Sequence, residues 1–498
     1  MAGIPAHILE LRRDAERGDK EAQYALAEHL LSGDEIARDE AEARKWLDRA
    51  SRQGHSGARW RLGELSKQGV DTKPKAAPAK PMSPPTRRPP PPPPKPLSAR
   101  ERLLPTVEVD PDALELGVLA DDPPEVLRPL AEGGDTAAQV ALGNACREGG
   151  GVPVDLAEAA RWYGLAAQAG DARGQYSLGV MHDRGLGVAQ SDAEALGWYL
   201  KAAKQGDAGA QFNLGNMIRL GRGVAADATV AGQWFRKAAD QGEVSAMVAL
   251  AGLLEAGQGV ARDEVQAAEL YRAAADRGDA QAQFNLANML RLGRGVDRDL
   301  YEAASLYHRA AAQGLAAAEL NWGLMLANGL GCIKDDRSAV LWLTRAAEKG
   351  EARAQHHLGR MHEQGRGVAK DTARAALWYR RAADQGDPQA HYDLSIMLLQ
   401  GDGVTRDDTE AAQRLRLAAG AGLAPAQYNL GVVLATGRGV GPDTAEAHAW
   451  FTLAAASSLE RIALSARKAA ETLAGRLDIA GLGRSAAVRK AYEEGRAP

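Results

Sequence analysis

Nine glycines in this chain stand 36 residues apart, and their spacing constrains the fold more than any other feature. They are Gly134, Gly170, Gly206, Gly242, Gly278, Gly314, Gly350, Gly386 and Gly422, with no insertion or deletion between them. A fixed period of this length is the signature of a repeat protein, in which each repeat contacts mainly its neighbours. We therefore expect a stack of similar small units rather than one large core.

Each 36-residue repeat carries the signals of two helices. The opening glycine suits the residue after a helix, where a positive φ is needed, and in five repeats the next residue is an aspartate that can cap a new helix. A GRGV-like motif then supplies the glycines of a tight turn. The turn is followed by a second capping residue at Asp155, Ser191, Asp227, Asp263, Asp299, Asp335, Asp371, Asp407 and Asp443. In five repeats a glutamate three residues later suggests a capping box.

Small and aromatic residues recur at fixed places and predict how the helices pack. Gly143, Gly179, Gly215 and Gly359 in the first helix would let two helix axes approach closely. Tryptophans in the second helix are expected to fill the gaps between repeats, namely Trp162, Trp198, Trp234, Trp342, Trp378 and Trp450. Core packing is a better interpretation of these tryptophans than sugar stacking, because their place in the repeat is fixed.

The motifs AQFNLGNMIRLGRGV and WYRRAADQGD, at this spacing, resemble the Sel-one-like repeat (SLR) family, a branch of the tetratricopeptide superfamily. The resemblance covers residues 134–457 as nine repeats. It implies an all-α fold, an α/α superhelical solenoid of helix–turn–helix repeats whose concave surface binds proteins or peptides. The departures are Arg414 in place of tryptophan, Leu315 and Leu423 in place of a capping aspartate, and Cys332 in place of the turn valine.

The rest of the chain divides into four segments. Residues 1–70 repeat the pattern once and a half and predict a small module of about four helices, whereas residues 71–100 hold twelve prolines and predict an extended, basic linker. Residues 101–133 end in EVLRPLAEGGD, which resembles the last helix of a degenerate repeat and predicts an N-terminal cap. Residues 458–498 predict a C-terminal helical cap with a polar outer face, followed by a tail.

Charge and cysteine content exclude several classes of protein. Outside the linker, 54 basic residues face 64 acidic ones, which is the wrong sign for nucleic-acid binding. Two cysteines form no disulfide framework and no metal motif. The sequence shows no signal peptide and no apolar run of 18 residues, so we expect no membrane insertion and a cytoplasmic protein. Its richness in Ala, Arg and Gly is typical of a bacterial chain.

Asparagines on the first helices are the main candidates for partner binding. Asn213 and Asn216, with Arg219 one turn later, are matched by Asn285, Asn288 and Arg291 two repeats further on. Side-chain amides can donate to and accept from an extended peptide backbone, and the arginines can pair with an acidic side chain or a terminal carboxylate. The alternative is that the asparagines bond neighbouring helices. That alternative is favoured for Asn213 and Asn285 and is about even for Asn216 and Asn288.

Three further candidates are weaker. The histidines His356, His357 and His362 share no metal-ligand spacing with a cysteine or paired carboxylates, so we predict no metal, no cofactor and no catalytic site. Arginines of the GRG turns (Arg222, Arg294, Arg366 and Arg438) form either a solvated rim, which is favoured, or an anion-binding stripe. The linker motif PTRRPPPPPPKP is either a spacer or a ligand for a proline-binding partner.

The sequence therefore favours a non-enzymatic scaffold or adaptor that binds protein or peptide partners on its concave face. The alternative is a regulatory inhibitor or secreted effector that masks a single target protein. Nothing in the residues selects the partner.

Overall fold

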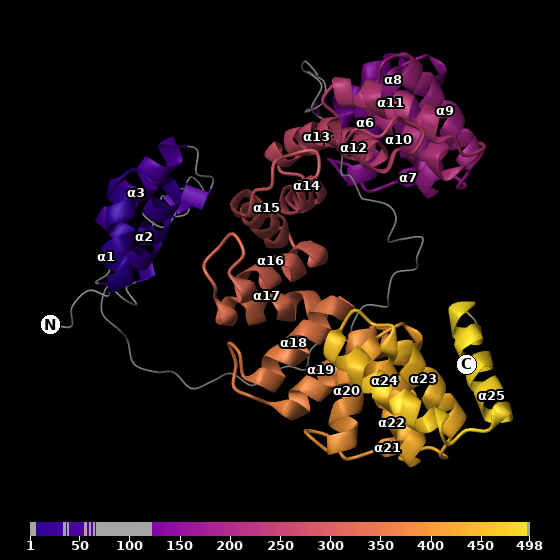
Figure 1. The fold of residues 1–498 in the computed structure, drawn as a ribbon. Coiled ribbons are helices and arrows are strands. Elements are labelled where there is room, and N and C mark those ends of the chain that lie inside the picture. Colours follow the sequence, from indigo (N-terminus) through magenta and orange to yellow (C-terminus); the bar gives the residue numbers. More distant parts are fainter. Residues whose placement is uncertain are drawn as a thin grey trace, which may run out of the picture. The chain divides into compact units, whose positions relative to one another are not determined.

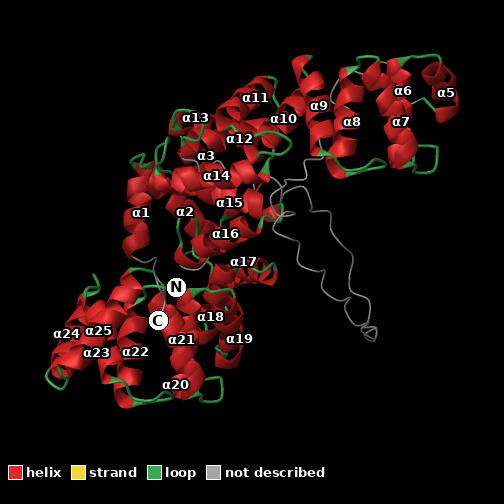
Figure 2. Ribbon diagram, turned by 90° about the vertical axis from the view of Figure 1, so that its right-hand side faces the viewer, coloured by secondary structure: helices red, strands yellow, loops and turns green. Residues whose placement is uncertain are grey.

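The computed structural model describes residues 6–32, 36, 39–53, 57–58, 61–62, 65 and 122–495. These residues form helices joined by short turns and include no strand (Figure 2), so the predicted all-α class is confirmed. They fall into two compact units, one of residues 61–298 and one of residues 1–60 together with 299–498. The predicted linker over 71–100 and residues 101–121 lie outside the described residues.

The compact unit of residues 61–298 is built from helix pairs that follow the 36-residue period (Figure 1). We call the helix after each opening glycine the first helix and the helix after the GRGV-like turn the second helix. The first helices are α6 (Thr136–Glu148), α8 (Ala172–Arg184), α10 (Ala208–Leu220), α12 (Val244–Ala256) and α14 (Ala280–Leu292). The second helices are α7 (Leu156–Gln168), α9 (Asp192–Lys204), α11 (Ala228–Asp240) and α13 (Glu264–Asp276), and α5 (Pro124–Glu132) comes before the first opening glycine.

The other compact unit continues the same alternation. Its second helices are α15 (Leu300–Ala312), α17 (Asp336–Glu348), α19 (Thr372–Asp384), α21 (Asp408–Gly420) and α23 (Thr444–Ala455). Its first helices are α16 (Ala316–Asn328), α18 (Ala352–Gln364), α20 (Pro388–Gln400) and α22 (Ala424–Thr436), and α24 (Glu460–Ala474) and α25 (Ile479–Glu493) follow. The N-terminal helices are α1 (Ala6–Glu16), α2 (Lys20–Ser32) and α3 (Glu40–Arg52).

Glycine and aspartate begin and end the helices as the sequence predicts. The nine opening glycines have φ between 88° and 100°, the left-handed region that glycine enters without steric cost. The side chain of Asp387 accepts the backbone N–H of Ala390 at 2.8 Å, and Asp371 accepts that of Arg374 at 2.9 Å. Leu315 and Leu423 begin their helices in the same extended conformation without such a bond.

The uncapped start of α16 gives a first prediction. Leu315 has φ −70° and ψ 110°, close to the −62° and 120° of the capping Asp279. Because the backbone is already in the capping conformation, Leu315→Asp is expected to stabilise the protein by roughly 0.5–1 kcal/mol. Leu423→Asp should gain less, since Leu423 packs against the C-terminal apolar cluster. Urea denaturation of both variants measures this, and a loss of stability in Leu315→Asp would contradict it.

Glycines in the first helices leave room for the aromatic ring of the second helix. This confirms the prediction that the two helices approach closely at these glycines. A Cβ on Gly143 would lie 2.6 Å from the ring of Tyr163, and one on Gly359 would lie 2.7 Å from the ring of Tyr379. Both tyrosines are fully buried. No side chain larger than hydrogen fits at these glycines unless the ring moves.

The tryptophans fill the core only in part, which corrects the sequence prediction. Trp162 and Trp450 are fully buried, whereas Trp198, Trp234, Trp342 and Trp378 are half-buried. Cations lie over the half-buried rings, for example the Lys201 ammonium 3.7 Å from the Trp198 ring centre. The fully buried position is the next residue, which is Tyr163, Tyr199, Phe235, Tyr271, Tyr307, Leu343, Tyr379, Leu415 and Phe451 in the nine repeats.

A buried glutamine of the first helix joins three helices. Gln355 donates to the Ala347 carbonyl at the end of the preceding second helix at 3.0 Å, and its oxygen accepts from Gln385 at 2.8 Å. Gln175 and Gln211 bind in the same way, with Gln205 and Gln241 as donors. Because the three first-helix glutamines are buried, each of these repeats is fixed to its neighbours by satisfied buried polar groups.

Repeat six replaces this glutamine pair with charges. Glu319 is 0% exposed and stands where six of the other eight repeats have glutamine. Its carboxylate lies 2.8 Å from Lys349 Nζ and 3.3 Å from Arg345 Nε. Lys349 is at the place of Gln385 and also donates to the Gly314 carbonyl at 2.6 Å. The polar connection is kept, but it now depends on an ion pair between a buried carboxylate and two partly exposed cations.

Candidate functional site

The six predicted binding residues lie on two first helices of one compact unit, residues 61–298. Asn213, Asn216 and Arg219 are spaced by three residues on α10, so they share one face, and Asn285, Asn288 and Arg291 repeat this arrangement on α14. On α12, between them in sequence, the same places hold Ala249, Gly252 and Glu255. The row of asparagines is therefore interrupted once, by small residues.

Asn213 and Asn285 take part in helix packing. Asn213 hydrogen-bonds the hydroxyl of Tyr176 on the first helix of the previous repeat, and burial raises the pKa of Tyr176 to about 12. Asn285 hydrogen-bonds the hydroxyl of Tyr271, and its oxygen accepts from Gln281 at 2.9 Å. These contacts agree with the packing interpretation of both asparagines.

Asn216 and Asn288 have contacts within their own helices. Asn216 Oδ1 faces Arg219 at 3.5 Å, which is long for a hydrogen bond, and Asn288 Nδ2 donates to the Phe284 carbonyl at 3.1 Å. Both amides are half-buried and the Arg219 guanidinium is exposed. Asn216 can exchange its long local contact for a hydrogen bond to a ligand.

The helix between them leaves space at the same place. A Cβ built on Gly252 would meet its nearest atom, the Tyr271 hydroxyl, at 3.7 Å, an ordinary contact distance. Other repeats hold Val180, Leu324 and Ile396 at this place. Close packing therefore does not explain the glycine at position 252. Its consequence is that no side chain stands between Asn216 and Asn288.

The arginines of the GRG turns connect consecutive repeats, which corrects both sequence interpretations of them. Arg222 lies 2.5 Å from Asp183 and also pairs with Asp192, both in the preceding repeat. Arg366 donates to Asp336 at 2.6 Å and to the Ala327 carbonyl at 2.7 Å. Arg294 pairs with Glu255 and Glu264, and Arg438 with Asp408 and the Leu399 carbonyl. These cations are occupied by their own chain and form neither a solvated rim nor an anion stripe.

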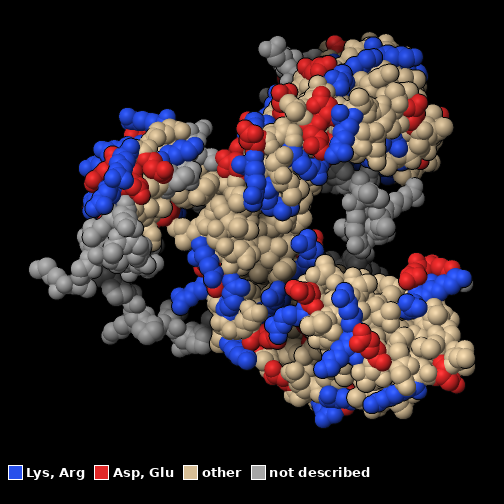
Figure 3. All heavy atoms as spheres, in the orientation of Figure 1, with Lys and Arg blue, Asp and Glu red and all other residues tan. Residues whose placement is uncertain are grey.

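The sequence carries a signal for these connections in the spacing of the arginines and their partners. An acid or a carbonyl lies 39 residues before each of these arginines, and a carboxylate lies 30 residues before it. Figure 3 shows acidic and basic side chains interspersed on the face that it draws.

His356 on α18 makes packing contacts with neighbouring helices. His356 Nε2 lies 2.7 Å from Asp393 Oδ2, and its ring contacts Tyr379 and His357. No group of three or more His, Cys, Asp and Glu side chains suited to a metal ion occurs among the described residues. The His356–Asp393 contact joins two first helices, as the Tyr176–Asn213 contact does.

His357 gives a prediction on pH. Burial, with the nearby charges of His356, Arg360 and Arg353, lowers the pKa of His357 to about 4. The unfolded residue titrates near 6.5, so stability is complete above about pH 6.5 and falls as the pH drops towards about 4. Urea denaturation at about pH 7 and about pH 5 measures how far the free energy of unfolding falls between them. For His357→Gln this fall is expected to be smaller than for the natural chain by on the order of 1–2 kcal/mol. Equal losses would contradict the assignment.

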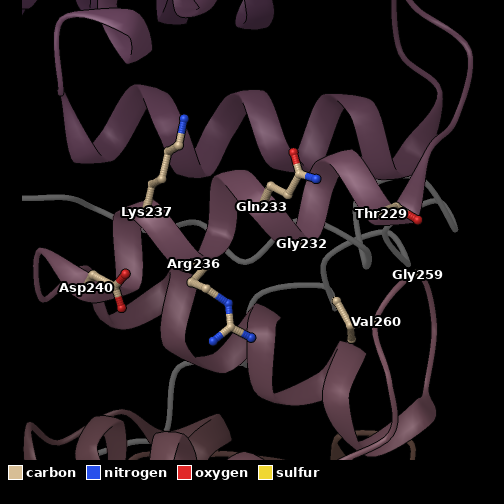
Figure 4. Close-up of a pocket in the computed structure, with 8 residues that line it drawn as sticks. All are labelled: Thr229, Gly232, Gln233, Arg236, Lys237, Asp240, Gly259 and Val260. Atoms are coloured by element: carbon tan, nitrogen blue, oxygen red, sulfur yellow. The ribbon is translucent and has the colours of Figure 1, made fainter.

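A hollow of about 500 Å³ lies against α11, on the opposite type of helix from the asparagines (Figure 4). Gly232 and Val260 form part of its lining, with Arg236, Lys237 and Asp240 around it. Arg236 donates to Gln266 at 3.2 Å and Lys237 lies over Trp234. Since both cations are engaged, the hollow offers less binding chemistry than the first-helix face.

Comparisons with known proteins identify the family. The Sel1 repeat model matches residues 20–55 and nine successive segments from 136 to 459. A protective antigen of uropathogenic Escherichia coli with an SLR fold is similar over 99% of this chain and 95% of its own, with 29% identity and a TM-score of 0.69. A Sel1 repeat protein from Oxalobacter formigenes is 32% identical over 62% of this chain and 93% of its own, with a TM-score of 0.46. No curated protein matches the chain.

These matches indicate the family of the chain and the general function of its repeats. Repeats of this type form non-catalytic scaffolds for protein–protein interaction. No described helix combines the length and the apolar composition that a membrane-spanning segment requires. The predicted resemblance is confirmed, because ten matched repeats make up most of the 498 residues: the chain belongs to the Sel1 repeat family.

Proposed function

We propose that this protein is a scaffold that holds an extended peptide segment of a protein partner across the first helices of repeats three to five. Asn216 and Asn288 would bind the peptide backbone, with Arg219 and Arg291 beside them. The observation that carries the proposal is the row Asn216, Gly252, Asn288, in which two amides occupy the same place on α10 and α14 and the intervening helix α12 has no side chain there.

The chemistry of the amides suits a backbone ligand. Each asparagine offers one acceptor and two donor hydrogens, which match the N–H and C=O groups of an extended chain. Recognition of this kind holds a peptide without selecting its side chains, so it supports a scaffold for segments that differ in sequence. Because its contact with Asn216 is long, the Arg219 guanidinium can turn to a carboxylate of the partner.

The proposal is tested by peptides selected from a random displayed library on the full-length protein. The double variant Asn216→Ala with Asn288→Ala is expected to weaken their binding by roughly tenfold or more, because each lost hydrogen bond is worth about 1 kcal/mol. The melting temperature should remain nearly unchanged, since both amides are only half-buried.

Two further variants sharpen the test. Asn328→Ala is the control, because Asn328 Nδ2 donates to the Leu324 carbonyl within its helix as Asn288 does to Phe284, but lies elsewhere in the chain. It should leave binding unchanged. Gly252→Leu copies Leu324 of repeat six and should block binding without lowering stability. Peptides that bind all four proteins equally would refute the proposed site.

A further inference from the structure

Two arginines and a histidine share one face of α18, the first helix of repeat seven. Arg353 and Arg360 are seven residues apart in the sequence. This spacing is close to two turns of an α-helix, so both side chains lie on the same face, and His357 lies between them. Both arginines are exposed and His357 is half-buried. We call Arg353, His357 and Arg360 the α18 arginine face.

Neither arginine of this face has a partner among the residues that the structure describes. Arg353 and Arg360 form no ion pair and no side-chain hydrogen bond there. Other arginines in the turns and second helices of the same compact unit do pair with carboxylates, and they include Arg366, Arg380, Arg414, Arg416 and Arg438. The two guanidinium groups on α18 are therefore available to a ligand.

The acids of the surrounding first helices are already engaged. Helices α16, α18 and α20 contain three of them, Glu319, Glu363 and Asp393. Glu319 is fully buried with its own cations. Glu363 accepts the Tyr379 hydroxyl at 2.7 Å, and Asp393 lies 2.7 Å from His356. The acids within these helices thus leave the charge of the two arginines without a direct partner.

The titration of His357 is consistent with positive charge at this face. Burial lowers the pKa of His357 to about 4, and the charges of His356, Arg360 and Arg353 act in the same direction. Asp387, at the start of α20, acts in the opposite direction. Neighbouring cations disfavour a further cation and attract an anion. The surroundings of His357 therefore favour a bound carboxylate.

The helices before and after α18 carry unbonded amides at matching places. Asn321 on α16 stands one repeat before His357 and is half-buried, and Gln389 on α20 stands one repeat after Arg353 and is exposed. Neither side chain hydrogen-bonds another residue in the described part of the chain. Each amide can donate to and accept from a peptide backbone. Groups for carboxylates and groups for a backbone thus occur on consecutive first helices.

We propose that the α18 arginine face binds an acidic segment of a protein partner, with one carboxylate on Arg353 and another on Arg360. A guanidinium can bind a carboxylate through two parallel hydrogen bonds. The two arginine Cα atoms are separated by about 10 Å along the helix, a distance that an extended chain covers in about three residues. Aspartates or glutamates at that spacing fit best. Because this face lies in the compact unit that contains residues 299–498, it is a second contact that does not depend on the proposed function.

The test uses a fluorescein-labelled hexaglutamate peptide, with hexaglutamine as its uncharged counterpart, titrated with the full-length protein at about 20 mM ionic strength to limit screening. Arg353→Gln with Arg360→Gln is expected to weaken hexaglutamate binding by roughly tenfold. The melting temperature should not fall, because neither arginine has a partner to lose. The control, Arg374→Gln with Arg406→Gln, removes the same charge from exposed arginines that are already paired, and should change binding by less than about twofold.

Three outcomes overturn the proposal. Hexaglutamate that does not bind, or binds no better than hexaglutamine, shows that the face does not attract acids. An equal loss in the control variant shows that only net charge matters. A loss on Arg219→Gln with Arg291→Gln in place of the α18 variant puts the acids on α10 and α14 instead. Asn216→Ala with Asn288→Ala should leave hexaglutamate binding unchanged, which separates this site from the peptide site proposed above.

Discussion

Replacing Gly439 with alanine is expected to destabilise the C-terminal repeats by about 2–5 kcal/mol. Gly439 has φ +73°, where a residue with a Cβ costs about 1–2 kcal/mol. Its Cβ would also fall on the backbone carbonyl of Asp408, the first residue of the preceding second helix. A backbone group cannot rotate away as a side chain can, so the turn must shift and overpacking of this kind adds about 1–3 kcal/mol.

Two other glycines separate these contributions. Gly386 has φ +88° but no atom within 4 Å of the Cβ that alanine would add, so Gly386→Ala should cost only about 1–2 kcal/mol. Gly441 lies in the same turn as Gly439, with neither a positive φ nor a close neighbour, and Gly441→Ala should change stability by less than about 0.5 kcal/mol. Urea denaturation of the three variants gives the ranking, and equal effects at Gly439 and Gly441 would show that the turn does not contact the preceding repeat as described.

Loss of Lys349 is expected to have the second large effect. Lys349→Ala removes the closest cation from the fully buried Glu319 carboxylate and leaves Arg345 at 3.3 Å. Breaking a fully buried ion pair costs about 3–5 kcal/mol. Because Lys349 is 39% exposed and Arg345 remains as a partner, we expect a loss of about 2–4 kcal/mol. Lys334→Ala, which breaks the exposed pair with Asp336, should cost less than about 1 kcal/mol.

The repeat itself suggests the rescue. Glu319→Gln combined with Lys349→Gln recreates the pair that Gln355 and Gln385 form one repeat later. The double variant is expected to be within about 1 kcal/mol of the natural chain in urea denaturation, although each single change leaves an unmatched buried group. Additive losses in the double variant would mean that the two residues are not coupled.

The sequence predicts the helices well because their ends depend on local signals. The positive φ of Gly134 and the cap at Asp371 follow from residue type and neighbours alone, and a period without gaps extends each of them to nine repeats. The close packing at Gly143 could also be predicted from the sequence. Glycine destabilises a helix interior, so a glycine there indicates that a neighbouring group approaches closely.

Contacts between repeats were harder to predict, because they join residues 30 to 39 apart. Arg222 looked exposed in a glycine-rich turn, yet its partners Asp183 and Asp192 are in the preceding repeat. The sequence predicted that Trp198 is a core residue because its side chain is large and apolar, but the buried residue is Tyr199. The role of Asn213 depends on the hydroxyl of Tyr176, one repeat earlier, and no local pattern shows that pairing.

The central claim, that a peptide lies across the first helices of repeats three to five, is tested most directly by hydrogen–deuterium exchange of the full-length protein with and without a library-selected peptide. Bound peptide is expected to slow exchange in α10, α12 and α14 and to leave the second helices α11 and α13 unchanged. Slowed exchange confined to α11 and α13, or to repeats outside three to five, would contradict the claim.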